Sequence, residues 1–206
     1  MSSRFTLLPA GKNSRMRVGL FGGSFNPPHV GHLHFAKEAI KRLNLDKLVW
    51  LVAPQNPMKD VALRHSFSRR ITDVRKFVRH PKMAVSDIET YQRHTYTAAT
   101  IARLRKMHPN VEFIWLMGAD NLPSFHKWHR WKNIVEAAPI CVFDRVIDKV
   151  VNVYSALKSR VIKHCNVSVI TRNSSMQCVS PQSISMMRGK RINISSTLLR
   201  ATKNYV

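Results

Sequence analysis

Residues 18–33 of the chain read VGLFGGSFNPPHVGHL. The apolar run at 18–22 is typical of a buried strand, and the glycines at its end mark a turn. Pro27 and Pro28 keep this turn extended, so a helix can begin only near Val30. The stretch therefore predicts a buried strand, a tight turn and an amphipathic helix in direct succession.

The same alternation of apolar runs and helical periodicity continues along the chain. Further strands are expected at 48–53, 83–86, 111–117, 140–143, 167–170 and 192–194, and helices at 31–44, 66–78, 97–107, 131–138, 146–158 and from about 196. Strands that alternate with helices predict a parallel sheet covered on both faces. We therefore expect an α/β fold, a Rossmann-like three-layer sandwich with a central parallel sheet.

Length and charge narrow the class of protein. The chain of 206 residues has room for one well-cored domain, which we expect over 17–206, after a flexible basic extension at 1–16. Its 34 Lys and Arg residues against 11 Asp and Glu residues give a net charge of +23, which predicts attraction to anions. The basic residues are scattered rather than striped, which disfavours nucleic acid as the anion. No apolar run approaches the ~20 residues of a membrane span, so no membrane partner is expected.

The cysteines indicate a reducing compartment. Cys141, Cys165 and Cys178 are odd in number and form no CxxC pair, so neither a disulfide framework nor a cysteine zinc site is expected. The first fifteen residues lack the apolar core of a secretion signal. We therefore expect a cytoplasmic protein.

His29 and His32 lie three residues apart where the first helix is expected to begin. At this spacing both imidazoles can face the space in which the N–H groups of a helix start favour a phosphate. Such a pair also occurs as surface decoration, and a zinc site would need a third ligand that the neighbouring sequence does not supply. The glycines and prolines before the pair favour phosphate binding, with no metal site.

A second anion-binding pattern lies near the carboxyl end, where residues 194–200 read ISSTLLR. Ser195, Ser196 and Thr197 can offer hydroxyl and N–H groups at a helix start, and Arg200, one turn later, can hold phosphate oxygens. Taken alone, an ordinary serine-capped helix would look the same.

Together the two patterns resemble the signature of the nucleotidylyltransferase superfamily, whose (H/T)xGH motif matches 29–32 and whose ISSTxxR motif matches 194–200. Over 17–206 the chain is most similar to the bacterial nicotinate-nucleotide adenylyltransferases. The resemblance implies that His29, His32 and Arg200 are catalytic. It implies an ATP site formed by Gly22, Gly23, Ser24, Phe25, His29, His32, Ser195, Ser196, Thr197 and Arg200.

Three internal segments extend the resemblance to a mononucleotide pocket: the loop at 51–59, the HTYT segment at 94–97, and the segments GADN and FHKWH at 118–121 and 125–129. The implied mononucleotide-binding residues are Lys59, Tyr96, Thr97, Gly118, Asp120 and Trp128. From the residues alone, Lys59 could equally be an exposed loop lysine, Thr97 or Asp120 a helix cap, and Trp128 a core residue. His129 stands where some relatives carry tyrosine.

The activity implied by the resemblance is adenylyl transfer from ATP to nicotinate mononucleotide in NAD biosynthesis, with Mg²⁺ carried in by ATP. The attacking phosphate is already anionic, so catalysis would rest on positioning and charge neutralisation rather than on a general base. The alternatives are a basic nucleic-acid-binding module on the same fold, and a sibling transferase for nicotinamide mononucleotide or pantetheine phosphate. A monomer and a homo-oligomer are both compatible with these residues.

Overall fold

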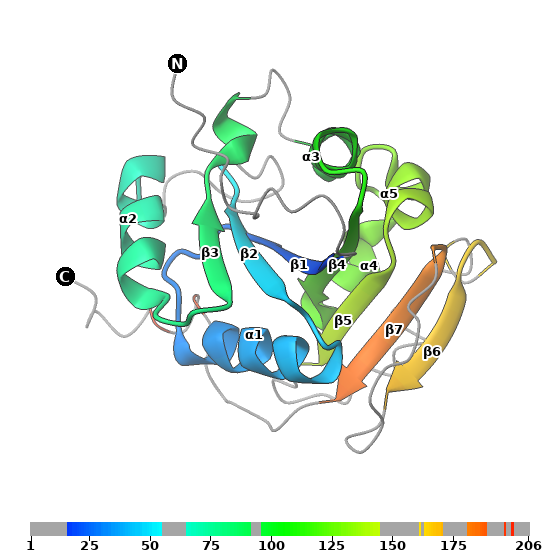
Figure 1. Ribbon diagram of the computed structural model, residues 1–206, viewed down its shortest axis with the longest axis horizontal. Coiled ribbons are helices and arrows are strands. Elements are labelled where there is room, and N and C mark those ends of the chain that lie inside the picture. The colour runs from blue at the N-terminus through cyan, green and yellow to red at the C-terminus, as the bar shows by residue number, and fades with distance from the viewer. Residues whose placement is uncertain are drawn as a thin grey trace.

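The computed structural model describes residues 16–54, 65–91, 96–144, 161, 163–170, 181–188, 196 and 199 (Figure 1). The helix expected at 146–158, the strand expected at 192–194 and residues 1–15 of the extension expected at 1–16 lie outside this part of the chain, whereas Met16 is the first residue of a strand. None of the described helices is long and apolar enough to cross a membrane.

The described strands form one sheet in which every neighbouring pair is parallel. Their order across the sheet is β3-β2-β1-β4-β5-β7-β6. The strands are β1 (Met16–Gly23), β2 (Lys47–Val52), β3 (Met83–Ser86), β4 (Val111–Gly118), β5 (Ile140–Asp144), β6 (Asn166–Ile170) and β7 (Ser183–Arg188). The parallel sheet expected from the sequence is confirmed.

The sequence pattern does not predict β7, although this strand lies between β5 and β6. Ser183 and Ser185 are buried in the sheet together with Ile184 and Met186. A strand buried on both faces usually has a nearly continuous apolar run. The alternate serines interrupt that run, so the hydrophobic pattern alone does not predict the strand.

Helices cover both faces of the sheet (Figure 1). On one face, α1 (Val30–Arg42) and α2 (Phe67–Phe77) pack against a core that includes Trp50. On the other, α3 (Thr97–Met107), α4 (Leu122–Phe125) and α5 (Trp131–Ala137) pack against a core that includes Leu20. Short 3-10 turns at Ile88–Tyr91 and Ala119–Asn121 follow β3 and β4. The predicted three-layer sandwich is confirmed.

Glu89 is a buried carboxyl group in the 3-10 turn after β3. The hydroxyl of Thr100, in α3, donates a hydrogen bond to its Oε1 at 3.2 Å. Burial raises the pKa of the Glu89 carboxyl to about 7, and the Thr100 hydrogen bond opposes this rise. Glu89 is therefore neutral in the folded protein over a pH range in which an exposed glutamate is ionised.

Gly19 provides a test of how tightly the core beside β1 is packed. A Cβ at Gly19 would lie 2.7 Å from Cδ1 of Leu45 and 2.9 Å from Cδ1 of Leu116, and both leucines are fully buried. We expect Gly19→Ala to lower the free energy of unfolding by about 1 to 3 kcal/mol, because a close-packed core must shift to admit the methyl group. Urea denaturation measures this change, and an unaltered midpoint would contradict the packing.

The raised pKa of Glu89 predicts a pH-dependent stability. Because the folded pKa lies above the ordinary value near 4.5, the stability contributed by the protonated carboxyl is present below pH 4.5 and is lost as the pH rises towards 7. Glu89→Gln stays neutral throughout and keeps the oxygen that accepts from Thr100. We expect its stability relative to the native protein to rise by about 2 to 3 kcal/mol between pH 5 and pH 8.

Urea denaturation of both proteins at the two pH values measures this difference. The matched control is Glu136→Gln, because the Glu136 side chain is 49% exposed. Its stability relative to the native protein should change by less than about 0.5 kcal/mol. A difference for Glu89→Gln that stays flat with pH would show that the carboxyl is ionised in the fold.

Candidate active site

The order of the strands reverses between β1 and β4. From β1 the chain runs through α1 to β2 and then to β3, and it returns to pair β4 with the other side of β1. The segments that follow β1 and β4 therefore diverge at the carboxyl edge of the sheet, which is the place where such sheets usually bind their ligands. The turn after β1 carries His29 and His32, and the segment after β4 carries Asp120.

The two histidines lie together at the start of α1. His29 is 3% exposed and His32 is 8% exposed, and their rings stack with centroids 3.6 Å apart at an interplanar angle of 29°. The N–H of His29 donates to Nδ1 of His32 at 3.2 Å. Because Nδ1 accepts this bond, a neutral His32 carries its proton on Nε2, where it can donate to an oxygen. The structure therefore supplies a fixed donor where the sequence predicts phosphate binding.

Aromatic side chains hold the His32 ring in place. Its centroid lies 5.2 Å from that of Phe25 and 6.1 Å from that of Phe21. Phe25 itself packs edge-on against Phe21, with centroids 5.2 Å apart, and has a left-handed backbone with φ of 43°. A phenylalanine rarely adopts this conformation, so the surrounding contacts must hold the turn in a strained shape.

The glycines at the end of β1 are required by packing inside the protein. A Cβ at Gly22 would overlap the ring of Trp115, and one at Gly23 would lie 2.9 Å from Cζ of Phe25. The space beside both glycines is thus filled by protein side chains. Their role in ATP binding, through the backbone, stays a prediction, as does that of Ser24.

The carboxyl-terminal motif reaches the turn after β1. Ser196 is helical, and its hydroxyl donates to the carbonyl oxygen of Pro27 at 2.9 Å. This contact joins the two stretches that the sequence selects as phosphate-binding, although they lie at opposite ends of the chain. The neighbouring candidates Ser195, Thr197 and Arg200 lie outside the described residues, and so does Lys59.

Two of the candidate mononucleotide residues, Gly118 and Asp120, lie where β4 ends. Gly118 ends β4, and Asp120 lies exposed in the 3-10 turn that follows. The N-cap of this turn is Gly118 and that of α4 is Asn121, so Asp120 caps neither element. The N-cap of α3 is Tyr96, and Thr97 is the first residue of that helix rather than its cap.

Aromatic contacts on this side of the site involve Tyr96 and Trp128. Tyr96 stacks on His129, with ring centroids 4.2 Å apart at 24°. Trp128 is half-buried and packs edge-on against Phe125 and Trp115, with centroids 5.5 Å and 6.4 Å apart. Trp128 therefore belongs to the core packing, as the alternative interpretation of the sequence held, and its part in binding the pyridine ring stays a prediction.

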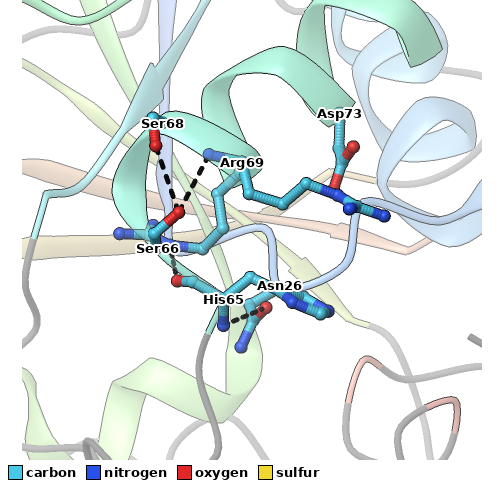
Figure 2. A network of polar contacts seen from close by, with 7 residues as sticks. Asn26, His65, Ser66, Ser68, Arg69 and Asp73 are labelled. Atoms are coloured by element: carbon cyan, nitrogen blue, oxygen red, sulfur yellow. Dashed lines mark hydrogen bonds and ion pairs between the residues drawn. The ribbon is translucent and has the colours of Figure 1, made fainter. Parts of the chain in front are cut away.

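The sequence analysis missed Arg70, a buried residue of α2 next to the turn after β1. Its guanidinium donates to main-chain carbonyls in three segments, one of which is Ser24 in that turn. Figure 2 shows a further tie at the start of α2, where the N–H of His65 donates to Oδ1 of Asn26 at 3.4 Å. A signal was present, because Arg70 lies on the apolar face formed by Phe67, Ile71 and Val74.

Comparison with known proteins agrees with this geometry. The model of the Cytidylyltransferase-like family matches residues 20–202. A probable nicotinate-nucleotide adenylyltransferase of Cereibacter sphaeroides is 39% identical over 192 residues, which cover 92% of this chain and 100% of the relative. One from a Ruegeria species is 48% identical over 135 residues, 66% of this chain and 71% of the relative.

Solved structures share the fold. The Plasmodium falciparum nicotinic acid mononucleotide adenylyltransferase complexed with NaAD has a TM-score of 0.66 with this chain at 16% identity. The match covers 90% of this chain and 83% of the other. Because the family model spans most of the chain and a relative is matched over its whole length, the chain belongs to the cytidylyltransferase-like family and, within it, to the nicotinate-nucleotide adenylyltransferases.

Proposed function

We propose that the protein transfers the adenylyl group of ATP to nicotinate mononucleotide and releases pyrophosphate, a step of NAD biosynthesis. The observation that carries this proposal is the hydrogen bond from Ser196 to the Pro27 carbonyl. It joins the carboxyl-terminal motif to the turn after β1, which carries His29 and His32 (the histidine turn), at the edge where the strand order reverses. The start of α1 and a helical residue of the second motif, brought together at this edge, are suited to bind the triphosphate of a nucleotide.

The reaction needs positioned charge more than proton transfer. An oxygen of the mononucleotide phosphate attacks the α-phosphorus of ATP, and the bond from that phosphorus to the oxygen bridging to the β-phosphate breaks. Pyrophosphate leaves with the electron pair of that bond. Because the nucleophile is already an anion, the protein contributes alignment and stabilisation of the charge that develops on the phosphates.

The candidate site residues can supply both contributions. His32 offers its Nε2–H as a donor to phosphate oxygens, and the stacked His29 ring lies beside it. Ser196, with Thr197 and Arg200, would hold the β- and γ-phosphates of the leaving group, and Mg²⁺ would arrive bound to ATP. On the other side, Tyr96, Thr97, Gly118, Asp120 and Trp128 would bind the mononucleotide.

We also propose that the protein acts in the cytoplasm. Cys141 and Cys165 are both free thiols, and burial raises the pKa of Cys141 to about 12 and that of Cys165 to about 11. Thiols of this kind react slowly, because the thiolate is the reactive form. Two cysteines without a disulfide in the described part of the chain support a reducing compartment.

The role of His32 is tested by His32→Ala. Loss of one positioned donor to the reacting phosphates should lower kcat by about 10²-fold or more. The assay measures pyrophosphate release from ATP with nicotinate mononucleotide. The same assay with nicotinamide mononucleotide tests the alternative substrate. The control is His108→Ala, because His108 precedes β4 at the opposite end of the sheet. A normal kcat for His32→Ala would exclude this role.

The role of Trp128 is tested by its KM values. We expect Trp128→Ala to raise KM for the mononucleotide by about fivefold, which corresponds to the loss of about 1 kcal/mol of ring stacking, with KM for ATP nearly unchanged. Trp128→Phe keeps an aromatic face and should stay within about twofold of the native protein. Assays well below the melting temperature of each variant separate binding from lost core packing. Equal changes in both KM values would show that Trp128 does not bind the pyridine ring.

A further inference from the structure

Arg70 makes an unusual set of contacts for a buried arginine. It is 2% exposed, and its Nη1 donates to the carbonyls of Ser24 at 2.9 Å and Ala53 at 2.7 Å. Its Nη2 donates to the carbonyl of Pro54 at 2.7 Å, and its Nε to that of His65 at 3.2 Å. These four carbonyls belong to the turn after β1, the segment after β2 and the residues before α2.

Such a set of acceptors requires a guanidinium. Its planar fork carries five donors, so one side chain can reach acceptors in several directions at once. A lysine ammonium at the same position has three donors on a single nitrogen and cannot span the three segments. A charge buried in this way is tolerated only when its hydrogen bonds are made, so the carbonyls and Arg70 depend on one another.

The contact with Ser24 acts on the shape of the turn. The carbonyl of Ser24 belongs to the peptide plane that enters Phe25, and the orientation of this plane determines the φ angle of Phe25. That angle is 43°, in the left-handed region that a phenylalanine avoids. The hydrogen bond from Arg70 therefore holds the peptide plane in the orientation that the strained turn needs.

The strained turn in turn orients a candidate catalytic side chain. The Phe25 ring packs edge-on against the His32 ring with centroids 5.2 Å apart. A second tie from the same region, the bond of the His65 N–H to Oδ1 of Asn26, holds the next residue of the turn (Figure 2). A continuous chain of contacts thus runs from Arg70 through Ser24 and Phe25 to His32.

We propose that Arg70 is a positioning residue for adenylyl transfer. It does not touch the substrate in this role. It holds the turn after β1 against the ends of β2 and α2, so that the His29 and His32 rings meet the triphosphate in a fixed orientation. The inference rests on the proposed function for its kinetic readout, whereas the orientation of His32 can be measured without activity.

The test compares two arginine-to-lysine changes in the first turns of α2. Arg70→Lys keeps the charge and loses the fork. Arg69→Lys is the matched control, because the Arg69 side chain is 56% exposed and pairs with Asp73 along the helix at 3.2 Å (Figure 2). Arg70→Ala, assayed with and without millimolar guanidinium ion, tests whether the fork alone restores function. Thermal unfolding of each variant establishes that the fold is retained.

We expect Arg70→Lys to lower kcat by about 10²-fold, the effect of a small misplacement of reacting groups, with KM for the mononucleotide within about twofold. Guanidinium ion should restore kcat of Arg70→Ala at least about tenfold and should not restore His32→Ala. Arg69→Lys should behave as the native protein. A kcat for Arg70→Lys within about twofold of the native value, or loss of the fold in both Arg70 variants, would overturn the proposal.

A spectroscopic readout separates this inference from the proposed function. The imidazole resonances of His32, assigned by their absence in His32→Ala, should shift in Arg70→Lys and stay in place in Arg69→Lys. If the native protein released no pyrophosphate, the proposed function would fail while these resonances still reported on the positioning role. Unchanged His32 resonances in Arg70→Lys would overturn the positioning role, whatever the activity of the native protein.

Discussion

The parallel pairing of β1 with β4 determines where the candidate active site lies in the fold. Because the chain leaves β1 through α1 towards β2 and returns to β4 on the other side, the segments after these two strands diverge at one edge of the sheet. The turn with His29 and His32 follows β1 at this edge, the turn Ala119–Asn121 follows β4, and Ser196 contacts the first of these turns. Without that pairing the two turns would not lie at one edge of the sheet.

The turn after β1 has its shape because neighbouring segments hold it on several sides. Gly23 leaves room for the Phe25 ring, and the hydroxyl of Ser196 donates to the carbonyl of Pro27. From α2, the guanidinium of Arg70 donates a hydrogen bond to the carbonyl of Ser24. A strained backbone persists only where its surroundings determine it in this way, and such sites are often functional.

Two buried ionisable groups near this edge show opposite solutions to burial. The guanidinium of Arg70 is surrounded by main-chain carbonyls, which are acceptors that its donors can use while it stays charged. Glu89 instead accepts a hydrogen bond from the Thr100 hydroxyl, and burial raises the pKa of its carboxyl group to about 7, which favours the neutral form. Both groups stabilise contacts inside the protein. The net charge of +23, in contrast, is a property of the whole chain and favours its attraction to anions.

The α/β class, most element boundaries and the family could be predicted from the sequence, because periodicity, turn residues and the two motifs are local in the chain. It could not reveal β7, whose buried serines interrupt the apolar pattern, nor the partners of Trp128, which lie in other elements. It also missed Arg70, because an arginine on an apolar helix face identifies no acceptor until the fold brings three carbonyl-bearing segments together. The contact between residues 27 and 196 becomes visible only in the folded protein, because a hydrogen bond between distant segments depends on the order of the strands and not on the residues around either end.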